Sequence, residues 1–173
     1  MFLSVVIPTY NRLPILEKCL RALEQQQLEA PISAYEVVVV DDGSTDDTVN
    51  WLLRNGHAFP HVRLVQQDHG GPAEGRNRGV DHARGDVIVF IDSDLVVTDS
   101  FLISHARRLE QTWQQRGDRL CFTYGAVINT ANFDDPTSEP HKLSDLSWAY
   151  FATGNVAIDR EVLERSGLFD TRF

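Results

Sequence analysis

The chain has 173 residues, and 16 lysines and arginines against 25 aspartates and glutamates give it a formal net charge of −9 at pH 7. With 42% hydrophobic and 24% charged residues, the composition is that of one folded domain and excludes a disordered tail or a fibrous repeat. The acid excess argues against nucleic acid as a partner, since sequence-independent binding of phosphates needs a basic surface. No apolar run approaches the ~20 residues of a transmembrane segment.

Strands and helices are expected to alternate along the chain. Apolar, β-branched segments predict strands at residues 4–8, 35–40, 62–65 and 86–91, and an alternating pattern predicts another at 120–129, at the edge of the core. Helical spacing of apolar residues, or turn residues followed by helix formers, predicts helices after each of the first four strands. Such alternation implies an α/β fold, with a mainly parallel sheet and helices on both faces.

Local signals predict how two of these helices begin. Asn11 is expected to cap the first helix, and Ser44 with Asp47 resembles a capping box at the second. Gly75 and Gly79 lie inside the third predicted helix, where each glycine costs roughly 1 kcal/mol relative to alanine. We therefore expect another part of the chain to approach that helix closely.

Two further features concern domain organisation and redox state. Residues 1–173 are expected to form a single domain, in which 130–147 combine prolines with acidic residues and predict a polar, mobile loop. Cys19 and Cys121 lie far apart, without the spacing of a zinc site. They are predicted to be buried thiols in a reducing compartment.

Polar clusters follow three of the predicted strands, at residues 9–11, 41–42 and 92–94. Ligands of parallel α/β sheets bind at the carboxyl ends of the strands, so we expect these clusters to meet at one rim. Asp92 and Asp94 flank a single residue and suit Mg²⁺ or Mn²⁺, which keeps positions open for phosphate oxygens. The alternative for Asp94 is a simple turn cap.

Four other residues have a ligand-binding and a structural interpretation. Asp42 is suited to accept a hydrogen bond from a nucleobase, or is a turn acid before a glycine. Arg76 either faces a base or diphosphate, or is a solvated helical arginine. Gly154 and Asn155 precede an apolar strand, where Gly154 alone would indicate a bulge.

Five segments together resemble the family 2 glycosyltransferases of the GT-A fold, in the order in which that family carries them. They span residues 4–12, 39–46, 75–79, 85–94 and 167–170. The resemblance implies a GT-A, Rossmann-like fold and transfer of a hexose-type sugar from a nucleoside-diphosphate sugar to an acceptor hydroxyl. It also implies an inverting displacement, assistance by Mg²⁺ or Mn²⁺, and a glycan, lipid or other hydroxyl compound as acceptor.

The resemblance also implies roles for individual residues. The residues expected to bind the donor are Pro8, Thr9, Tyr10, Asp42, Arg76, Asp92 and Ser93. Asp94 is the expected metal ligand. Gly154 and Asn155 are expected beside the transferred sugar and the acceptor, where Thr153 replaces the first glycine of the family's Gly-Gly-Asn and adds bulk.

Family members carry a Glu-Asp pair after the segment that matches residues 167–170, and its carboxylate is the general base. Deprotonation of the acceptor requires such a base, which we expect beyond Phe173. Two hypotheses follow. The chain is part of a longer enzyme, or it is a non-catalytic nucleotide-sugar-binding or regulatory module of a larger protein. The expected location is cytoplasmic, or peripheral at the inner face of a membrane.

Overall fold

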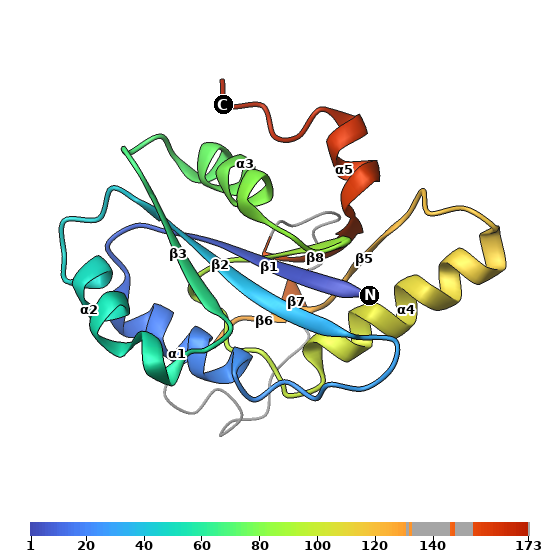
Figure 1. The fold of residues 1–173 in the computed structure, drawn as a ribbon, viewed down its shortest axis with the longest axis horizontal. Coiled ribbons are helices and arrows are strands. Elements are labelled where there is room, and N and C mark those ends of the chain that lie inside the picture. The colour runs from blue at the N-terminus through green and yellow to red at the C-terminus, as the bar shows by residue number, and fades with distance from the viewer. Residues whose placement is uncertain (131, 133–145, 148–153, 173) are drawn as a thin grey trace.

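The computed structural model describes residues 1–130, 132, 146–147 and 154–172 and is built around a six-stranded sheet (Figure 1). The strands are β1 (Phe2–Thr9), β2 (Ala34–Asp42), β3 (Val62–Gln67), β4 (Val87–Ile91), β5 (Phe122–Tyr124) and β8 (Asn155–Asp159). Their order across the sheet is β3-β2-β1-β4-β8-β5. The first four run parallel, and β8 runs antiparallel to both its neighbours.

Helices cover both faces of this sheet (Figure 1). The helices are α1 (Leu13–Leu23), α2 (Thr48–Asn55), the 3₁₀ turn η1 (Gly56–Ala58), α3 (Pro72–His82), α4 (Phe101–Arg116) and α5 (Arg160–Ser166). Neighbours in a strand point to opposite faces. Val5 accordingly packs in the core under α1, α2 and α4, and Val6 in the core under α3 and α5. The prediction of a mainly parallel sheet with helices on both faces is confirmed.

Helix α3 lies unusually close to the sheet at its two internal glycines. A Cβ atom added at Gly79 would come within 2.2 Å of Val6 Cγ1, and one at Gly75 within 3.1 Å of Pro8 Cβ. The predicted close approach is therefore present, and β1 is the segment that approaches. It places the first turns of α3 along the carboxyl end of β1.

The two predicted helix caps are wrong, because their side chains bind other loops. Asn11 adopts φ 52° and accepts hydrogen bonds from the amides of Thr45 (2.7 Å) and Asp46 (3.1 Å). The Ser44 hydroxyl in turn accepts one from the Asn11 amide at 2.9 Å. Neither α1 nor α2 has a side-chain cap. These bonds tie the loop after β1 to the loop after β2.

The chain after α4 differs in part from its prediction. The single strand expected at 120–129 is divided into β5, at the edge of the main sheet as expected, and β6 (Val127–Ile128). β6 pairs with β7 (Leu146–Ser147) in a separate two-stranded sheet. Most of the expected loop at 130–147 lies outside the described residues, as does Thr153. Within the described parts, no helix is both long and apolar enough to cross a membrane.

Both cysteines are free thiols. Cys19 is fully buried in the core, and burial, together with the nearby carboxylates of Asp94 and Asp92, raises its pKa to about 12. Cys121 is only partly buried, so the prediction of burial is correct for Cys19 and wrong for Cys121. With so high a pKa, the Cys19 thiol is inert as a nucleophile at neutral pH.

Candidate functional site

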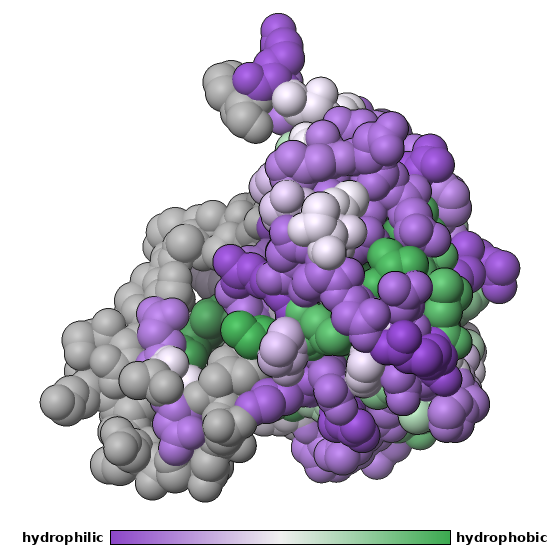
Figure 2. Space-filling view, turned by 90° about the vertical axis from the view of Figure 1, so that its left-hand side faces the viewer, coloured by the Kyte–Doolittle hydropathy of each residue, from purple (hydrophilic) through white to green (hydrophobic). Residues whose placement is uncertain are grey.

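A pocket of about 390 Å³ opens at the carboxyl ends of the parallel strands. The residues that line it are Pro8, Thr9, Tyr10, Arg12, Asp42, His69, Pro72, Arg76, Asp92, Ser93 and Asp94. The structure thus brings together residues from all three polar clusters that follow strands, and every residue expected to bind the donor. Seen from this side, the surface is mostly hydrophilic (Figure 2), as suits a polar ligand.

The two aspartates after β4 are each paired with an arginine. Arg76 Nη2 lies 2.7 Å from Asp92 Oδ1, and Arg12 Nη1 lies 2.6 Å from Asp94 Oδ2. The carboxylates remain 44% and 43% exposed, so ligands can reach them from the pocket. Asp94 is therefore paired with the Arg12 guanidinium at the rim of the pocket, and its ligand-binding role stays a prediction.

Arg76 is held in place from several sides. Its side chain is only 11% exposed, which excludes the solvated helical arginine considered above. It also donates to the Pro72 carbonyl at 3.3 Å, and its guanidinium carbon lies 5.8 Å from the centre of the Phe169 ring. Asn77 binds the Phe169 backbone through two hydrogen bonds of 2.8 and 3.0 Å. The 167–170 segment thus packs on α3 and supports Arg76 at the pocket.

The Asp42 carboxylate is almost fully buried and accepts three hydrogen bonds. The donors are the amides of Gly70 (2.8 Å) and Gly71 (2.9 Å) and Gln67 Nε2 (2.7 Å). His69 Nδ1 lies 2.9 Å from Asp42 Oδ2, and its hydrogen bond goes to the Asp42 carbonyl oxygen at 3.1 Å. Burial alone would raise the pKa of Asp42, but the bonds from Gly70, Gln67 and Gly71 and the nearby His69 outweigh it and hold the pKa below its ordinary value. The carboxylate lines the pocket as expected, yet its oxygens are already engaged.

Three residues that line this pocket were not expected from the sequence: Arg12, His69 and Pro72. The His69 ring stacks on Tyr10 with 4.3 Å between ring centres and 28° between ring planes. No motif marks a lone histidine between a strand and two glycines. Arg12 belongs to the segment 4–12, but its partner Asp94 is 82 positions away, and only the fold brings them together.

Gly154 and Asn155 have different positions relative to the pocket. A Cβ atom added at Gly154 would lie 2.9 Å from Asp92 Oδ2, so this backbone packs directly against the aspartate. Asn155 is not among the residues that line the pocket, and its Oδ1 lies 2.8 Å from Nε2 of the buried His105. The other ring nitrogen of His105 lies 2.7 Å from the Thr123 hydroxyl. Asn155 is therefore part of a buried network that joins α4, β5 and β8.

This network gives a prediction for the pH dependence of stability. Burial lowers the pKa of His105 below 6.5, and the hydrogen bond to Asn155 opposes this only partly. Below pH 6.5 the unfolded chain binds a proton here that the folded chain does not, so stability falls as the pH decreases toward the folded-state pKa. Urea unfolding between pH 7.5 and 5 should show this loss, at up to about 1.4 kcal/mol per pH unit.

In His105→Gln the loss between pH 7.5 and 5 should be smaller than in the wild type, because the titrating group is gone. His57→Gln, at an exposed histidine of η1, is the matched control and should leave the pH profile unchanged. Parallel profiles for the wild type and His105→Gln would contradict the assignment.

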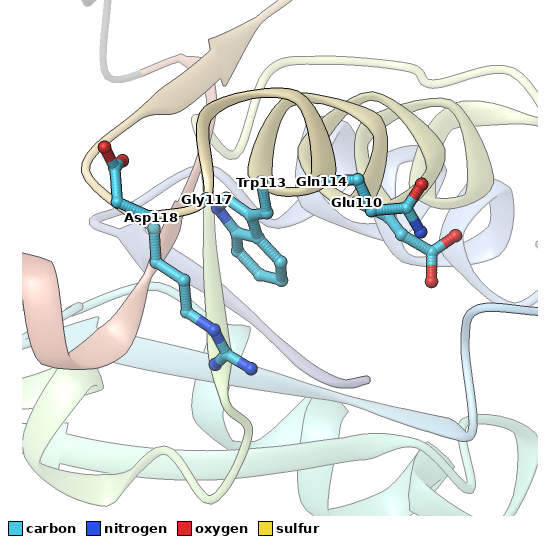
Figure 3. A pocket seen from close by; sticks show the side chains of 6 residues that line it. Glu110, Trp113, Gln114, Gly117 and Asp118 are labelled. Atoms are coloured by element: carbon cyan, nitrogen blue, oxygen red, sulfur yellow. The ribbon is translucent and has the colours of Figure 1, made fainter.

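A second hollow, of about 380 Å³, lies at the C-terminal end of α4 (Figure 3). Its wall includes Trp113, and the Arg119 guanidinium carbon sits 4.7 Å from the Trp113 ring centre. Arg119 also pairs with the buried Asp159 at 3.0 Å. None of the residues expected to bind donor or metal lines this hollow. Arg119 thus links the segment after α4 to Asp159 at the end of β8.

Comparison with known proteins identifies the family. Residues 4–167 match the family described as Glycosyl transferase family 2. The glycosyltransferase AglE of Haloferax volcanii is 30% identical over 171 residues, 97% of this chain and 56% of AglE.

Solved structures agree with this match. The mannosyltransferase PcManGT of Pyrobaculum calidifontis, in complex with GDP-Man and Mn²⁺, is 27% identical with a TM-score of 0.69, over 98% of this chain and 47% of that one. S. aureus TarS 1-349 with UDP-GlcNAc shares the fold at 23% identity and a TM-score of 0.66, over 98% and 48%. The chain thus spans about half the length of these relatives. It belongs to glycosyl transferase family 2 and has the GT-A fold.

Proposed function

We propose that this chain is the donor-binding part of a glycosyltransferase that moves a sugar from a nucleoside-diphosphate sugar to an acceptor hydroxyl, with metal assistance and inversion. The observation that carries the proposal is the pocket itself. Two half-exposed carboxylates, two arginines and an aromatic ring line one hollow at the carboxyl ends of the strands. The carboxylates are suited to bind a cation, the arginines a diphosphate and the aromatic ring a nucleobase.

The relatives support the chemical class of the donor. PcManGT was solved with GDP-Man and Mn²⁺, and TarS with UDP-GlcNAc. We extend a nucleotide-sugar donor and a divalent cation to this chain from those complexes. A cytoplasmic location stays a prediction.

The residues present fit a cation that is shared with a phosphate ligand. No three His, Cys, Asp or Glu side chains converge on a metal position within the described residues, so a fully protein-ligated site is not present there. Mg²⁺ and Mn²⁺ sites of phosphate enzymes need only one or two carboxylates, with phosphate and water completing the shell. Asp94 would hold the cation, with Asp92 beside it. When bound, the cation neutralises the diphosphate as it leaves.

The chain's own residues have complementary tasks in this proposal. Arg76 is fixed by Asp92 and Phe169 and holds positive charge at the pocket wall. Arg12 balances the charge of Asp94, and if Asp94 held a cation instead, the Arg12 guanidinium would be available to pair with phosphate. The base that deprotonates the acceptor stays a prediction from the resemblance, beyond Phe173.

A binding measurement tests the proposal. UDP, GDP and dTDP are titrated into the 173-residue chain with and without Mn²⁺, and heats of binding are recorded. We expect at least one nucleoside diphosphate to bind only with Mn²⁺, and Asp94→Asn to weaken that binding at least tenfold. Loss of a residue that merely supports a metal ligand already costs roughly 10- to 100-fold in affinity, so loss of a ligand costs no less.

Asp118→Asn is the matched control, because Asp118 is also paired with an arginine and is 39% exposed, but lies at the other end of α4. It should bind as the wild type does. Binding that needs no metal, or equal affinity of Asp94→Asn and the wild type, would overturn the metal-assisted donor site.

A further inference from the structure

The His69 imidazole covers the aromatic face that a nucleobase would use. Tyr10, at the end of β1, stacks on His69 with 4.3 Å between ring centres and 28° between the planes. Both rings line the pocket, and their side chains are partly exposed, Tyr10 at 41% of the residue and His69 at 59% of its side chain. Stacking of this kind contributes roughly 0.5–1.5 kcal/mol beyond burial.

The same imidazole also engages Asp42. Its Nδ1 lies 2.9 Å from Asp42 Oδ2 and 3.1 Å from the Asp42 carbonyl oxygen. Both partners are acceptors, so Nδ1 carries a hydrogen and donates it. His69 thus presents to this pocket a flat ring that stacks on Tyr10 and a ring N–H that reaches Asp42. A nucleobase with a ring N–H offers the same two interactions.

The Asp42 carboxylate has one acceptor position left, and the His69 imidazole covers it. Two carboxylate oxygens offer about four acceptor positions, and three donors bond to them. Oδ1 accepts two of these bonds and Oδ2 one, and His69 Nδ1 lies 2.9 Å from Oδ2. A base can bond to Oδ2 at this position only if the imidazole moves.

His69 can leave by side-chain rotation alone, whereas Gln67, the other side chain at this carboxylate, bonds to Oδ1 and has its own Oε1 buried. Its backbone is held close to Gly43, where an added Cβ atom would lie 3.0 Å from the His69 amide nitrogen. The imidazole, in contrast, extends into the pocket and is more than half exposed. Rotation about its side-chain bonds would clear Tyr10 and one position on Asp42 together, and the Gly70 and Gly71 bonds would stay.

We propose that His69 occupies the nucleobase position in the free protein and that the donor's base displaces it, taking over the stack on Tyr10 and the bond to Asp42. This inference rests on the proposed function, since it concerns the base of the same donor. His69 then lowers affinity for every nucleotide whose base carries a ring N–H. It does not affect ligands without a base.

His69→Ala tests the inference, with nucleoside diphosphates and pyrophosphate as probes. Alanine keeps the Cβ atom that faces Gly43 and removes the ring, so the fold is expected to persist. In titrations with Mn²⁺, His69→Ala should bind UDP, GDP or dTDP roughly three- to tenfold more tightly than the wild type, because no stack has to be broken first. Affinity for pyrophosphate with Mn²⁺ should not change.

His57→Ala, at an exposed histidine outside the pocket, is the control and should match the wild type for all probes. If the wild type binds a nucleoside diphosphate and His69→Ala binds it equally or more weakly, the inference is wrong and the proposed function stands. An equal gain for pyrophosphate would also refute it, because the effect would then lie at the phosphates. If no form of the chain binds any nucleoside diphosphate, the proposed function fails, and the inference fails with it.

Discussion

Asp42→Ala is expected to lower the free energy of unfolding by about 3 kcal/mol at pH 7. The substitution removes the acceptor of three hydrogen bonds and leaves the amides of Gly70 and Gly71 without their partner next to a buried position. A buried donor without an acceptor costs roughly 1–3 kcal/mol, and water at the rim of the pocket reduces the total for the two amides by bonding to them in part. Urea unfolding followed by circular dichroism measures the change.

The effect of Asp42→Ala should depend on pH in a defined direction. The pKa of Asp42 is held below 3.8 in the folded state, so its carboxylate stabilises the fold fully above that pH and less as the pH falls through the folded-state value. The difference between the wild type and Asp42→Ala should therefore shrink in strong acid. Asp47→Ala, at an aspartate that is 51% exposed and paired with Arg54, should change stability by less than about 0.5 kcal/mol. A similar loss in both variants would refute the special position of Asp42.

Gly79→Ala is expected to destabilise the chain by about 2 kcal/mol, although alanine favours a helix by about 1 kcal/mol over glycine. The added Cβ atom would lie 2.2 Å from Val6 Cγ1, and Val6 is fully buried in the middle of the sheet. The valine side chain is restricted at χ1 and cannot rotate its methyl group out of the contact, so α3 or β1 has to shift. Denaturant unfolding of the variant provides the measurement.

Gly56→Ala is the matched control for Gly79→Ala. An added Cβ atom at Gly56 meets nothing within 4 Å, and the glycine has helical dihedral angles, so alanine should be neutral or slightly stabilising there. The double variant Val6→Ala with Gly79→Ala should lose less stability than the two single changes added together. If Gly79→Ala stabilised the chain as much as Gly56→Ala, the contact between α3 and β1 would not be tight.

The strands could be predicted because their signals are local. The apolar run at 35–40 and the one at 86–91 each contain enough information to indicate a strand buried on both faces, and both are. The caps at Asn11 and Ser44 could not be predicted, because both side chains form hydrogen bonds between the loop after β1 and the loop after β2. A capping rule based on neighbouring residues does not account for a hydrogen-bonding partner in a distant loop. Likewise, no residue near Asn155 in the sequence predicts that its side chain will form a hydrogen bond with His105.

The pocket was predictable in outline for a similar reason. Residues that follow parallel strands share a rim whatever the details of packing, so Tyr10, Asp42 and Asp94 were expected together. Their partners were not, since Arg12 reaches Asp94 and His69 reaches Tyr10 only through the tertiary fold. The sequence thus indicates which groups line the pocket. The structure adds which of their hydrogen-bonding positions are already filled.

The place of β8 in the sheet has a consequence for the order in which the protein folds. β4 pairs on one side with β1 and on the other with β8, whose register places Ile91 opposite Asn155. During synthesis, the apolar β4 is therefore an open edge until residues far along the chain have left the ribosome, and open edges are where nascent chains aggregate. Gly154 directly precedes β8 and packs against Asp92. The late pairing of β8 with β4 therefore also brings the Gly154 backbone against the Asp92 side chain.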